Sequence, residues 1–279
     1  MRNAEFIEQR ITLVQLVDLL KRAIGSAVHA CDGFRYDFYE PRDRYAVLLL
    51  YRIIDQARAV VALAEANAYV AIPIVARSAL DAYADIANLA DHPRYWENLD
   101  AIDASKWKPL LERASQGRNL VLKALSEDKW LPVGRRKYAQ ELKELRAKGV
   151  EALGVDVRFE RAGLTNEYES TYAFLSAEAH NNISNLQSRY IDWDDEKAWM
   201  TPQGVMSTRS HEFELPCTLT MSEIVLRSTE KVLKLFGHGV AALSGPNREL
   251  ERMWQRAQAE ESGSSVPNTT IHSRKIHAG

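Results

Sequence analysis

The sequence predicts an all-α fold, a multi-helix bundle. Apolar residues recur every three or four positions along most of the chain, which is the spacing that lines one face of a helix. Residues that interrupt helices are few, with 13 Gly and 9 Pro among 279 residues. No convincing internal repeat is present, which disfavours a solenoid. We therefore expect one helical domain over residues 1–260 and a flexible tail over residues 261–279.

The N-terminal part predicts three long helices. Leu13, Leu16 and Leu20 follow a helical spacing, and the first helix is expected over residues 4–30. A run rich in Leu, Ala, Ile and Val without a breaker predicts a second helix over residues 43–68. Because proline suits the first turn of a helix, Pro73 starts a third helix, expected over 72–90.

The middle of the chain carries weaker, more polar helical patterns. They predict helices over residues 105–126 and 136–152, separated by a turn at Leu131-Pro132-Val133-Gly134. A further helix is expected over residues 165–184, where the Thr165 side chain is predicted to cap the first turn.

The C-terminal part is expected to begin with a short β-hairpin insertion within residues 197–215. Its predicted strands cover residues 197–200 and 212–215. Strong helical patterns then predict helices over residues 218–242 and 247–259.

The charges of the chain nearly balance, with 36 Lys and Arg against 38 Asp and Glu and a formal net charge of -2. This balance argues against binding of nucleic acid through a broad basic surface, but it is compatible with a local basic patch. We interpret two basic clusters as solvated helix faces, with nucleic-acid contact as the alternative. They are Arg135-Arg136-Lys137, and Arg227 with Lys231 and Lys234.

The sequence favours a cytoplasmic location and no membrane partner. Cys31 and Cys217 have neither the count nor the spacing of a disulfide framework. The first residues lack the apolar core of a secretory signal. The apolar run before Arg52 is far shorter than the roughly 20 residues that a spanning helix needs.

Four polar residues form a first polar row on the helix predicted over residues 72–90. Arg77, Asp81, Asp85 and Asn88 follow at intervals of four, four and three residues, so they share one helix face. The rest of this helix is nearly all apolar and is expected to be buried, so the row must face a polar partner or a wet cavity. We expect Arg77 to act in catalysis and Asp81 and Asp85 to bind a ligand.

A second polar row lies on the helix predicted over residues 165–184. Glu169, Tyr172, Ser176 and His180 follow at intervals of three, four and four residues. Ser176 and His180 stand one turn apart, and an imidazole titrates near neutral pH, so they are candidates for a nucleophile and its base. Tyr172 and Glu169 are candidate binding residues.

A structural role competes with each of these functional interpretations. A buried pair of Arg and Asp often holds helices together. A Ser four residues before a His on a helix often occurs by chance, without a catalytic role. No Gly-x-Ser-x-Gly turn presents the serine, and no phosphate-binding glycine loop occurs. No metal site is expected, because His180 has no second ligand at a standard spacing, and no cofactor is predicted.

Two segments resemble the paired signatures of a family of bacterial proteins of unknown function, DUF5677. They are Ala76-Arg77-Ser78-Ala79-Leu80-Asp81-Ala82 and Tyr172-Ala173-Phe174-Leu175-Ser176-Ala177-Glu178-Ala179-His180. The resemblance covers about residues 59–193 and implies a helical domain without an established activity. It matches Arg77, Asp81, Tyr172, Ser176 and His180, and so implies that the two polar rows belong together.

A more distant similarity is to the HEPN ribonucleases, helical proteins of bacterial conflict systems whose dimers cleave RNA with an Arg and a His. Their motif places the Arg four to six residues before the His on one helix, and residues 174–176 offer no Arg here. By this resemblance Arg77 would have to reach His180 from another helix.

Two classes of function follow. The first is a ligand-binding or interaction module of a bacterial stress or defence system. The second is a metal-independent ribonuclease that uses His180 and Arg77, with RNA as the partner. Whether the chain is an enzyme stays open between them, and apolar helix faces make a homodimer an option. Both interpretations require the two polar rows to lie against each other.

Overall fold

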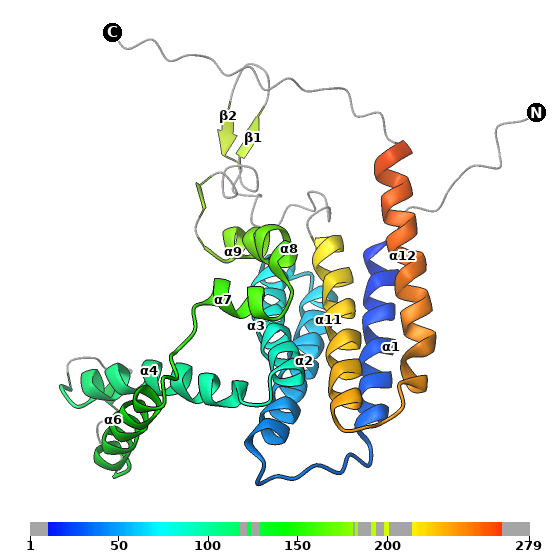
Figure 1. Ribbon diagram of the computed structural model, residues 1–279. Helices are drawn as coiled ribbons and strands as arrows, with labels where there is room; N and C mark the ends of the chain where they lie inside the picture. The colour runs from blue at the N-terminus through cyan, green and yellow to red at the C-terminus, as the bar shows by residue number, and fades with distance from the viewer. Residues whose placement is uncertain are drawn as a thin grey trace, which may run out of the picture.

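The protein is an all-α bundle from which a pair of helices projects as an arm (Figure 1). The computed structural model describes residues 11–117, 122–123, 129–180, 182–183, 191–193, 198–200 and 214–263. Of the first predicted helix, residues 4–10 lie outside this part, as does the tail expected from residue 261, apart from the end of the last helix. Within it, the predicted all-α fold class is confirmed.

The bundle is built from five long helices that stand side by side in Figure 1. Helix α1 contacts α2 and α11, and α3 lies against both α2 and α11, while α12 packs on α1 and α11. The helices are α1 (Leu13–Cys31), α2 (Pro41–Glu65), α3 (Ile72–Asp91), α11 (Glu214–Leu235) and α12 (Ser244–Gly263).

Local signals explain where these helices begin and end. Thr12 caps α1 together with Gln15 in a capping box, which satisfies two backbone groups that the helix itself cannot pair. Pro41 and Pro73 occupy the first turns of α2 and α3, where the missing amide hydrogen costs nothing. Arg42 donates to the carbonyls of Leu89 and Ala90 and so ties the start of α2 to the end of α3.

Alanines allow α2, α3 and their neighbours to approach closely. Ala57, Ala76, Ala79 and Ala84 are completely buried in the main core. Small side chains bring two helix backbones together, and the larger Leu and Ile side chains around them fill the remaining space. The third predicted helix, 72–90, is confirmed to within one residue at its C-terminal end.

The arm consists of α4 (Tyr95–Ala114) and α6 (Leu131–Ala147), which pack against each other beside the bundle (Figure 1). It has a small hydrophobic core of its own, separate from the main one. This core contains Ala104, Leu111, Ala114, Leu131 and Tyr138. The single domain expected over residues 1–260 therefore holds two hydrophobic clusters, and its boundaries stay a prediction.

Two predictions for the arm are wrong. The helix expected from residue 105 begins ten residues earlier, at Tyr95, whose ring is buried in the main core. The segment Leu131-Pro132-Val133-Gly134 is not a turn but the first turn of α6. Pro132 stands where a helix tolerates proline, and Gly134 leaves room for the Trp130 ring, which a Cβ would approach to 2.7 Å.

The chain between the arm and α11 forms a short helix that the sequence analysis missed and an irregular one that it predicted. The missed helix is α7 (Val155–Arg161). The predicted one comprises α8 (Thr165–Glu167), a π-helical turn (Tyr168–Tyr172) and α9 (Ala173–Ala179). It ends five residues before the expected residue 184, and Thr165 does not cap it, because Thr165 already lies inside the first turn.

The hairpin exists, but with a different pairing from the predicted one. Strand β2 (Ala198–Met200) pairs antiparallel with β1 (Ile191–Trp193), which precedes it in the chain. The second predicted strand, 212–215, overlaps the start of α11, and residues 212–213 lie outside the described part. The apolar spacing of residues 214–235 continues into a long helix, and this outweighs a short strand pattern.

The remaining helix ends are shifted. Helix α11 ends at Leu235, and a 3-10 turn (Ala241–Leu243) replaces the last residues of the helix expected to residue 242. Another 3-10 turn (Tyr69–Ala71) joins α2 to α3. In the described part of the chain, no helix has both the length and the apolar composition needed to cross a bilayer.

Candidate functional site

The two polar rows meet at one point, where Arg77 of α3 reaches the helix that contains α9. The Arg77 Nη2 atom donates to the Tyr172 hydroxyl at 3.0 Å, and Nη1 lies 3.4 Å from His180 Nε2. The guanidinium also stands over the Tyr172 ring, 5.1 Å from its centroid. The expected proximity of Arg77 to His180 is therefore observed, across 103 residues of sequence.

Arg77 makes no ion pair with a carboxylate in the described part of the chain, although its charge acts to lower the pKa of Asp81, one turn further along α3. Its hydrogen bonds go to a phenol and an imidazole, and its Nε atom is buried without a hydrogen-bond partner. An arginine only donates, so the contact with His180 is a hydrogen bond only when Nε2 carries no proton. The result is a half-buried positive charge held in place mainly by an aromatic residue.

The other end of the first polar row is built differently. Asp85 is buried and accepts two hydrogen bonds from Arg158 of α7, at 2.9 and 2.6 Å. It also accepts a third from the Tyr95 hydroxyl at 2.7 Å. Burial raises the pKa of Asp85, whereas Arg158 and Tyr95 favour the ionised carboxylate and oppose that rise.

Asn88 and Asp81 complete this end of the row around the same arginine. The completely buried Asn88 amide donates to the carbonyls of Ala84 and Arg158, at 2.9 and 2.7 Å. Asp81 lies 3.7 Å from Arg158 Nη1, and burial raises the pKa of its carboxyl. Asp81 and Asp85, which we expected to bind a ligand, thus bind α7 in this structure.

The second polar row lines an open pocket of about 510 Å³ along α9. Glu169, Tyr172, Ser176 and His180 all face it, as the spacing of the row predicts. Tyr168, Ala173, Ala177 and Asn182 complete the described lining. Arg77 is not part of the lining itself and lies directly behind it, in contact with Tyr172 and His180.

Ser176 and His180 are neighbours in the pocket, but their side chains are not joined. The bond between them is from the His180 backbone amide to the Ser176 carbonyl, at 3.0 Å, at the end of α9. The imidazole Nε2 instead faces Arg77. The nucleophile and base hypothesis for Ser176 thus gains no hydrogen bond from this arrangement and stays a prediction.

An aromatic cluster beneath the pocket fixes the helix on the bundle. The Phe159 ring is fully buried and contacts the rings of Tyr168 and Tyr172, with centroids 5.5 and 5.0 Å apart. The two tyrosine rings stack on each other within the π-helical turn. Such turns re-aim side chains at functional sites of many helices, and here the turn carries Glu169 and Tyr172.

Arg158 is the residue of this region that the sequence analysis missed. It lies in a helix of seven residues, which is too short to show a helical period. Its pattern, Val155-Asp156-Val157-Arg158-Phe159, alternates and gives no sign that an arginine is 7% exposed. Only the two unpaired acids on a buried helix signalled that a cation had to come from elsewhere.

Neither a metal centre nor a disulfide is visible in the described residues. No three His, Cys, Asp or Glu side chains of this part converge as ligands would, and neither Cys31 nor Cys217 is part of a disulfide. Burial raises the pKa of the Cys31 thiol to about 11.

Comparison with protein families gave one result. The chain matches the family of unknown function DUF5677 over residues 43–198, more than half of its length and a wider range than the 59–193 expected from the two motifs. Comparisons with curated proteins and with solved structures found no match. The matched segment contains α3, the arm, α7 and α9, and hence the whole contact of Arg77 with His180. The chain therefore belongs to the family DUF5677.

Proposed function

We propose that this chain is a ligand-binding helical module, and that the pocket along α9 takes a small phosphate-bearing ligand. The observation that carries the proposal is the guanidinium of Arg77, which lies 3.4 Å from His180 without a carboxylate partner in the described residues. A half-buried arginine that is not ion-paired is a favourable place for an anion, because guanidinium and phosphate form strong charge-assisted hydrogen bonds.

The lining of the pocket narrows the class of ligand. His180, which contacts the arginine, and Ser176 supply polar atoms to the pocket, and Tyr168 and Tyr172 supply aromatic surface. Glu169 is exposed at the same pocket and repels an anion, so it suits a part of the ligand that donates hydrogen bonds. A phosphate group attached to a body with hydroxyl or amino groups fits this combination.

The test is calorimetric binding of inorganic phosphate and of nucleoside monophosphates to the purified full chain. We expect binding by the wild type and a loss of at least about tenfold in Arg77→Ala, the scale of one charged hydrogen bond. Arg161→Ala removes an equal charge from an exposed position on nearby α7 and serves as the control. Equal binding by all three proteins contradicts the proposal.

A second candidate is metal-independent cleavage of RNA, favoured by the same contact. His180 Nε2 and Arg77 Nη1 are near enough to touch one phosphate group together, with the imidazole as general base and the guanidinium stabilising the negative charge of the transition state. Here the arginine comes from α3 rather than from the helix of the histidine, so the motif of the HEPN ribonucleases is not reproduced.

Cleavage of a labelled pool of total RNA and tRNA, without added metal, decides between the two candidates. Activity that is lost in both His180→Ala and Arg77→Ala, with helicity retained by circular dichroism, supports the ribonuclease. An inactive wild type that still binds phosphate leaves the ligand-binding module. A role in a stress or defence system, a bacterial source and a cytoplasmic location stay predictions, as does a homodimer.

A further inference from the structure

A pocket of about 320 Å³ lies where the arm joins the bundle, between α2 and α4. Its wall is mainly apolar and consists of Leu48 and Leu49 from α2 and Leu99 from α4. Leu48 is 55% exposed, so a large hydrophobic side chain remains open to solvent at this pocket. A cavity of this size and character suits the hydrocarbon part of a small ligand.

The polar atoms of the pocket belong mostly to two carboxylates. Asp100 and Asp103 stand one turn apart on α4 and line it together with Tyr45, whose phenol donates to Asp100. The ion pairs that the described residues make with α4 use Glu97 and Glu112 instead of these two acids. The described lining of the pocket therefore contains two carboxylates and no Lys or Arg.

Two cations stand near these acids, and each contacts an aromatic ring. Arg44 lies over the ring of Tyr45, 5.2 Å from its centroid, and Lys137 of α6 lies 5.3 Å from the centroid of Tyr138. Burial raises the pKa of Asp100, while the hydrogen bond from Tyr45 and the charges of Arg44 and Lys137 oppose this rise only in part. The negative charge of the pocket is thus incompletely compensated.

A third carboxyl interacts with the same pair. Burial, and next the charge of Asp100, raise the pKa of Glu141 on α6, and Asp103 adds to this effect while Lys137 opposes it. Carboxylates that repel one another are harder to ionise, and a bound cation relieves that repulsion. A positively charged ligand is therefore favoured over a neutral or negative one.

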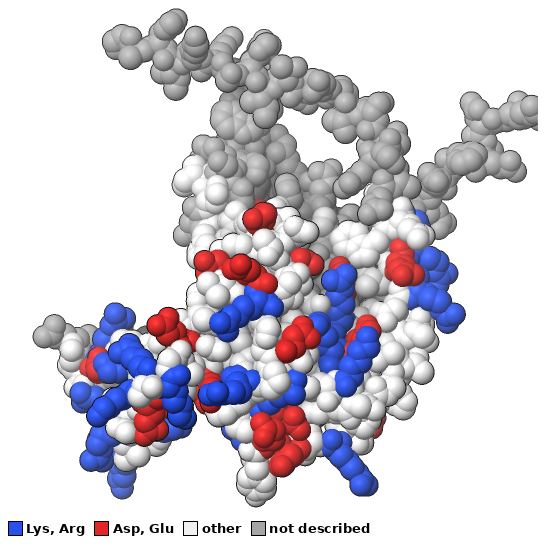
Figure 2. Space-filling view, viewed as in Figure 1, with Lys and Arg blue, Asp and Glu red and all other residues white. Residues whose placement is uncertain are grey.

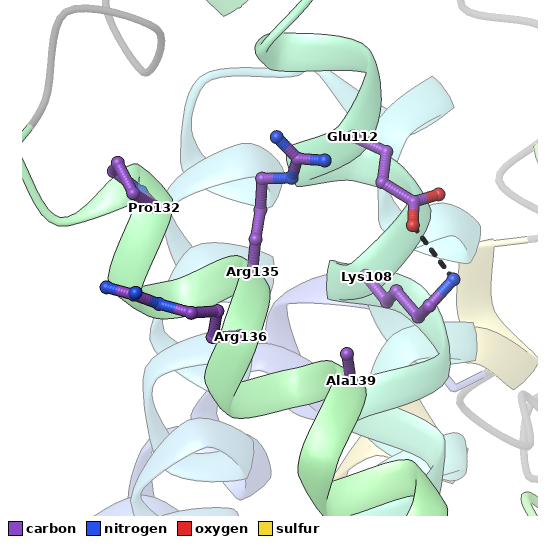
Figure 3. A pocket seen from close by; sticks show the side chains of 6 residues that line it. All are labelled: Lys108, Glu112, Pro132, Arg135, Arg136 and Ala139. Atoms are coloured by element: carbon purple, nitrogen blue, oxygen red, sulfur yellow. Dashed lines mark hydrogen bonds and ion pairs between the residues drawn. The ribbon is translucent and has the colours of Figure 1, made fainter.

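The other pocket of the arm is a compensated counterpart. Figure 2 shows Lys and Arg side chains gathered on the arm, and Arg135 and Arg136 of α6 line a pocket of about 470 Å³ with Lys108 and Glu112 of α4 (Figure 3). Glu112 pairs with Lys108 at 2.8 Å, and Lys108 first, then Arg135, lower its pKa. That pocket supplies its own counterion, whereas the pocket between α2 and α4 has no cation in its described lining.

We propose that the pocket between α2 and α4 binds a small organic cation, an ammonium or guanidinium group on an apolar body. The hydrocarbon lies against the three leucines, and the charged group donates to Asp100 and Asp103. Both kinds of cation carry several N–H donors, so either one can bridge two carboxylates one helical turn apart. This pocket shares no described lining residue with the pocket along α9 and does not rest on the function proposed there.

A metal ion fits this pocket less well. No three His, Cys, Asp or Glu side chains of the described residues are arranged as metal ligands, and this includes Asp100, Asp103 and Glu141. A hard cation such as Ca²⁺ takes six or more oxygen ligands and makes no use of a leucine wall. The combination of apolar wall and carboxylates is accounted for by a ligand that has both a hydrocarbon and a charge.

The experiment is calorimetric titration of the full chain with hexylamine, and with hexanol and hexanoate as its uncharged and negative analogues. We expect hexylamine to bind at least about tenfold more tightly than either analogue, the scale of one charged hydrogen bond. Propylamine, which lacks three methylene groups, should bind more weakly, by up to about fourfold for each methylene that the pocket buries.

The variants separate the two parts of the pocket. Asp100→Asn and Asp103→Asn should each weaken hexylamine about tenfold and leave hexanol unchanged, while Asp18→Asn, at an exposed position on α1, is the control and has no effect. Leu48→Ala should weaken hexylamine and hexanol alike, by a few fold, in contrast to Val14→Ala at a 70% exposed position. Circular dichroism checks that every variant retains its helices.

Several results overturn the proposal. They are a wild type that does not bind hexylamine, equal weakening by Asp18→Asn, and an affinity for ammonium ions equal to that for hexylamine, which would leave the leucines without a role. A lysine-containing peptide that binds when hexylamine does not also overturns it and makes the pocket part of a surface for a basic protein partner.

Discussion

The two ends of the first polar row differ in what they do, although the sequence presents them as one pattern. At one end Arg77 lies behind the lining of the pocket along α9, where it contacts Tyr172 and His180. Two turns further, Asp85 is closed in by Arg158 and Tyr95. Equal spacing on a helix thus fixes a common face, while the neighbours along that face decide whether a charge is available to a ligand or already used.

The comparison also explains why α7 matters for the site. Arg158 satisfies Asp85 and approaches Asp81, and the next residue, Phe159, supports Tyr168 and Tyr172. One short helix therefore neutralises the buried Asp85, lies within ion-pair distance of the partly exposed Asp81, and positions the aromatic residues that line the pocket. The contacts of Arg158 with Asp85 at one end of the row therefore also support Tyr172, the partner of Arg77, at the other end.

The largest expected effect comes from Arg158→Ala. It leaves Asp85 buried without its cation, and removing one partner of a buried pair costs about 3–5 kcal/mol in the free energy of unfolding. Urea denaturation followed by circular dichroism measures it. The nearby exposed Arg161→Ala is the control and should stay within about 0.5 kcal/mol of the wild type. Equal stabilities of the two variants would show that the pair with Asp85 does not hold α7.

The next effect in size belongs to Tyr95→Phe. It removes the hydroxyl that donates to the buried Asp85 at 2.7 Å and keeps the ring, so we expect a loss of about 1–3 kcal/mol. The same denaturation experiment with Tyr39→Phe, whose side chain is 88% exposed, controls for loss of a phenol. A change below that of the control would mean that Arg158 alone satisfies the carboxylate.

Alkaline pH tests the same phenol in another way. Burial, and secondarily the charge of Asp85, raise the pKa of Tyr95 above its ordinary value near 10. Above about pH 10 the unfolded chain loses this proton while the folded chain keeps it, so stability falls as pH rises. Tyr95 contributes about one proton to this difference between the unfolded and folded chains. In Tyr95→Phe the unfolding free energy should therefore fall less steeply, by about 1.4 kcal/mol per pH unit. An unchanged slope of unfolding free energy against pH would contradict the raised pKa.

The smallest effect on stability is expected at the pocket end. Arg77→Ala removes a hydrogen bond and a cation–π contact between the half-buried arginine and the buried Tyr172, at a cost of about 1 kcal/mol. His180→Ala, at an exposed position, should stay within about 0.5 kcal/mol. A loss comparable to that of Arg158→Ala would make Arg77 a structural residue and remove the contrast between the two ends.

The positions of most helices of the bundle can be predicted from the sequence because these helices are long. The apolar spacing of α3 and the proline in its first turn locate that helix to within one residue, and the spacing of Glu169, Tyr172, Ser176 and His180 predicts their common face. The turn predicted at the start of α6 is wrong, because Pro132 and Gly134 are equally typical of a turn and of a helix start packed against a tryptophan.

The sequence by itself determined the all-α class, the main helices, the family and the two rows of polar residues, because each depends on local spacing or on short motifs. Only the tertiary structure decided which distant side chain contacts each of these polar residues. Arg158 reaches Asp85 across 73 residues of sequence, and Arg77 reaches His180 across 103. Such contacts depend on which helices pack together, and no local pattern encodes the side chain that will arrive from a distant helix.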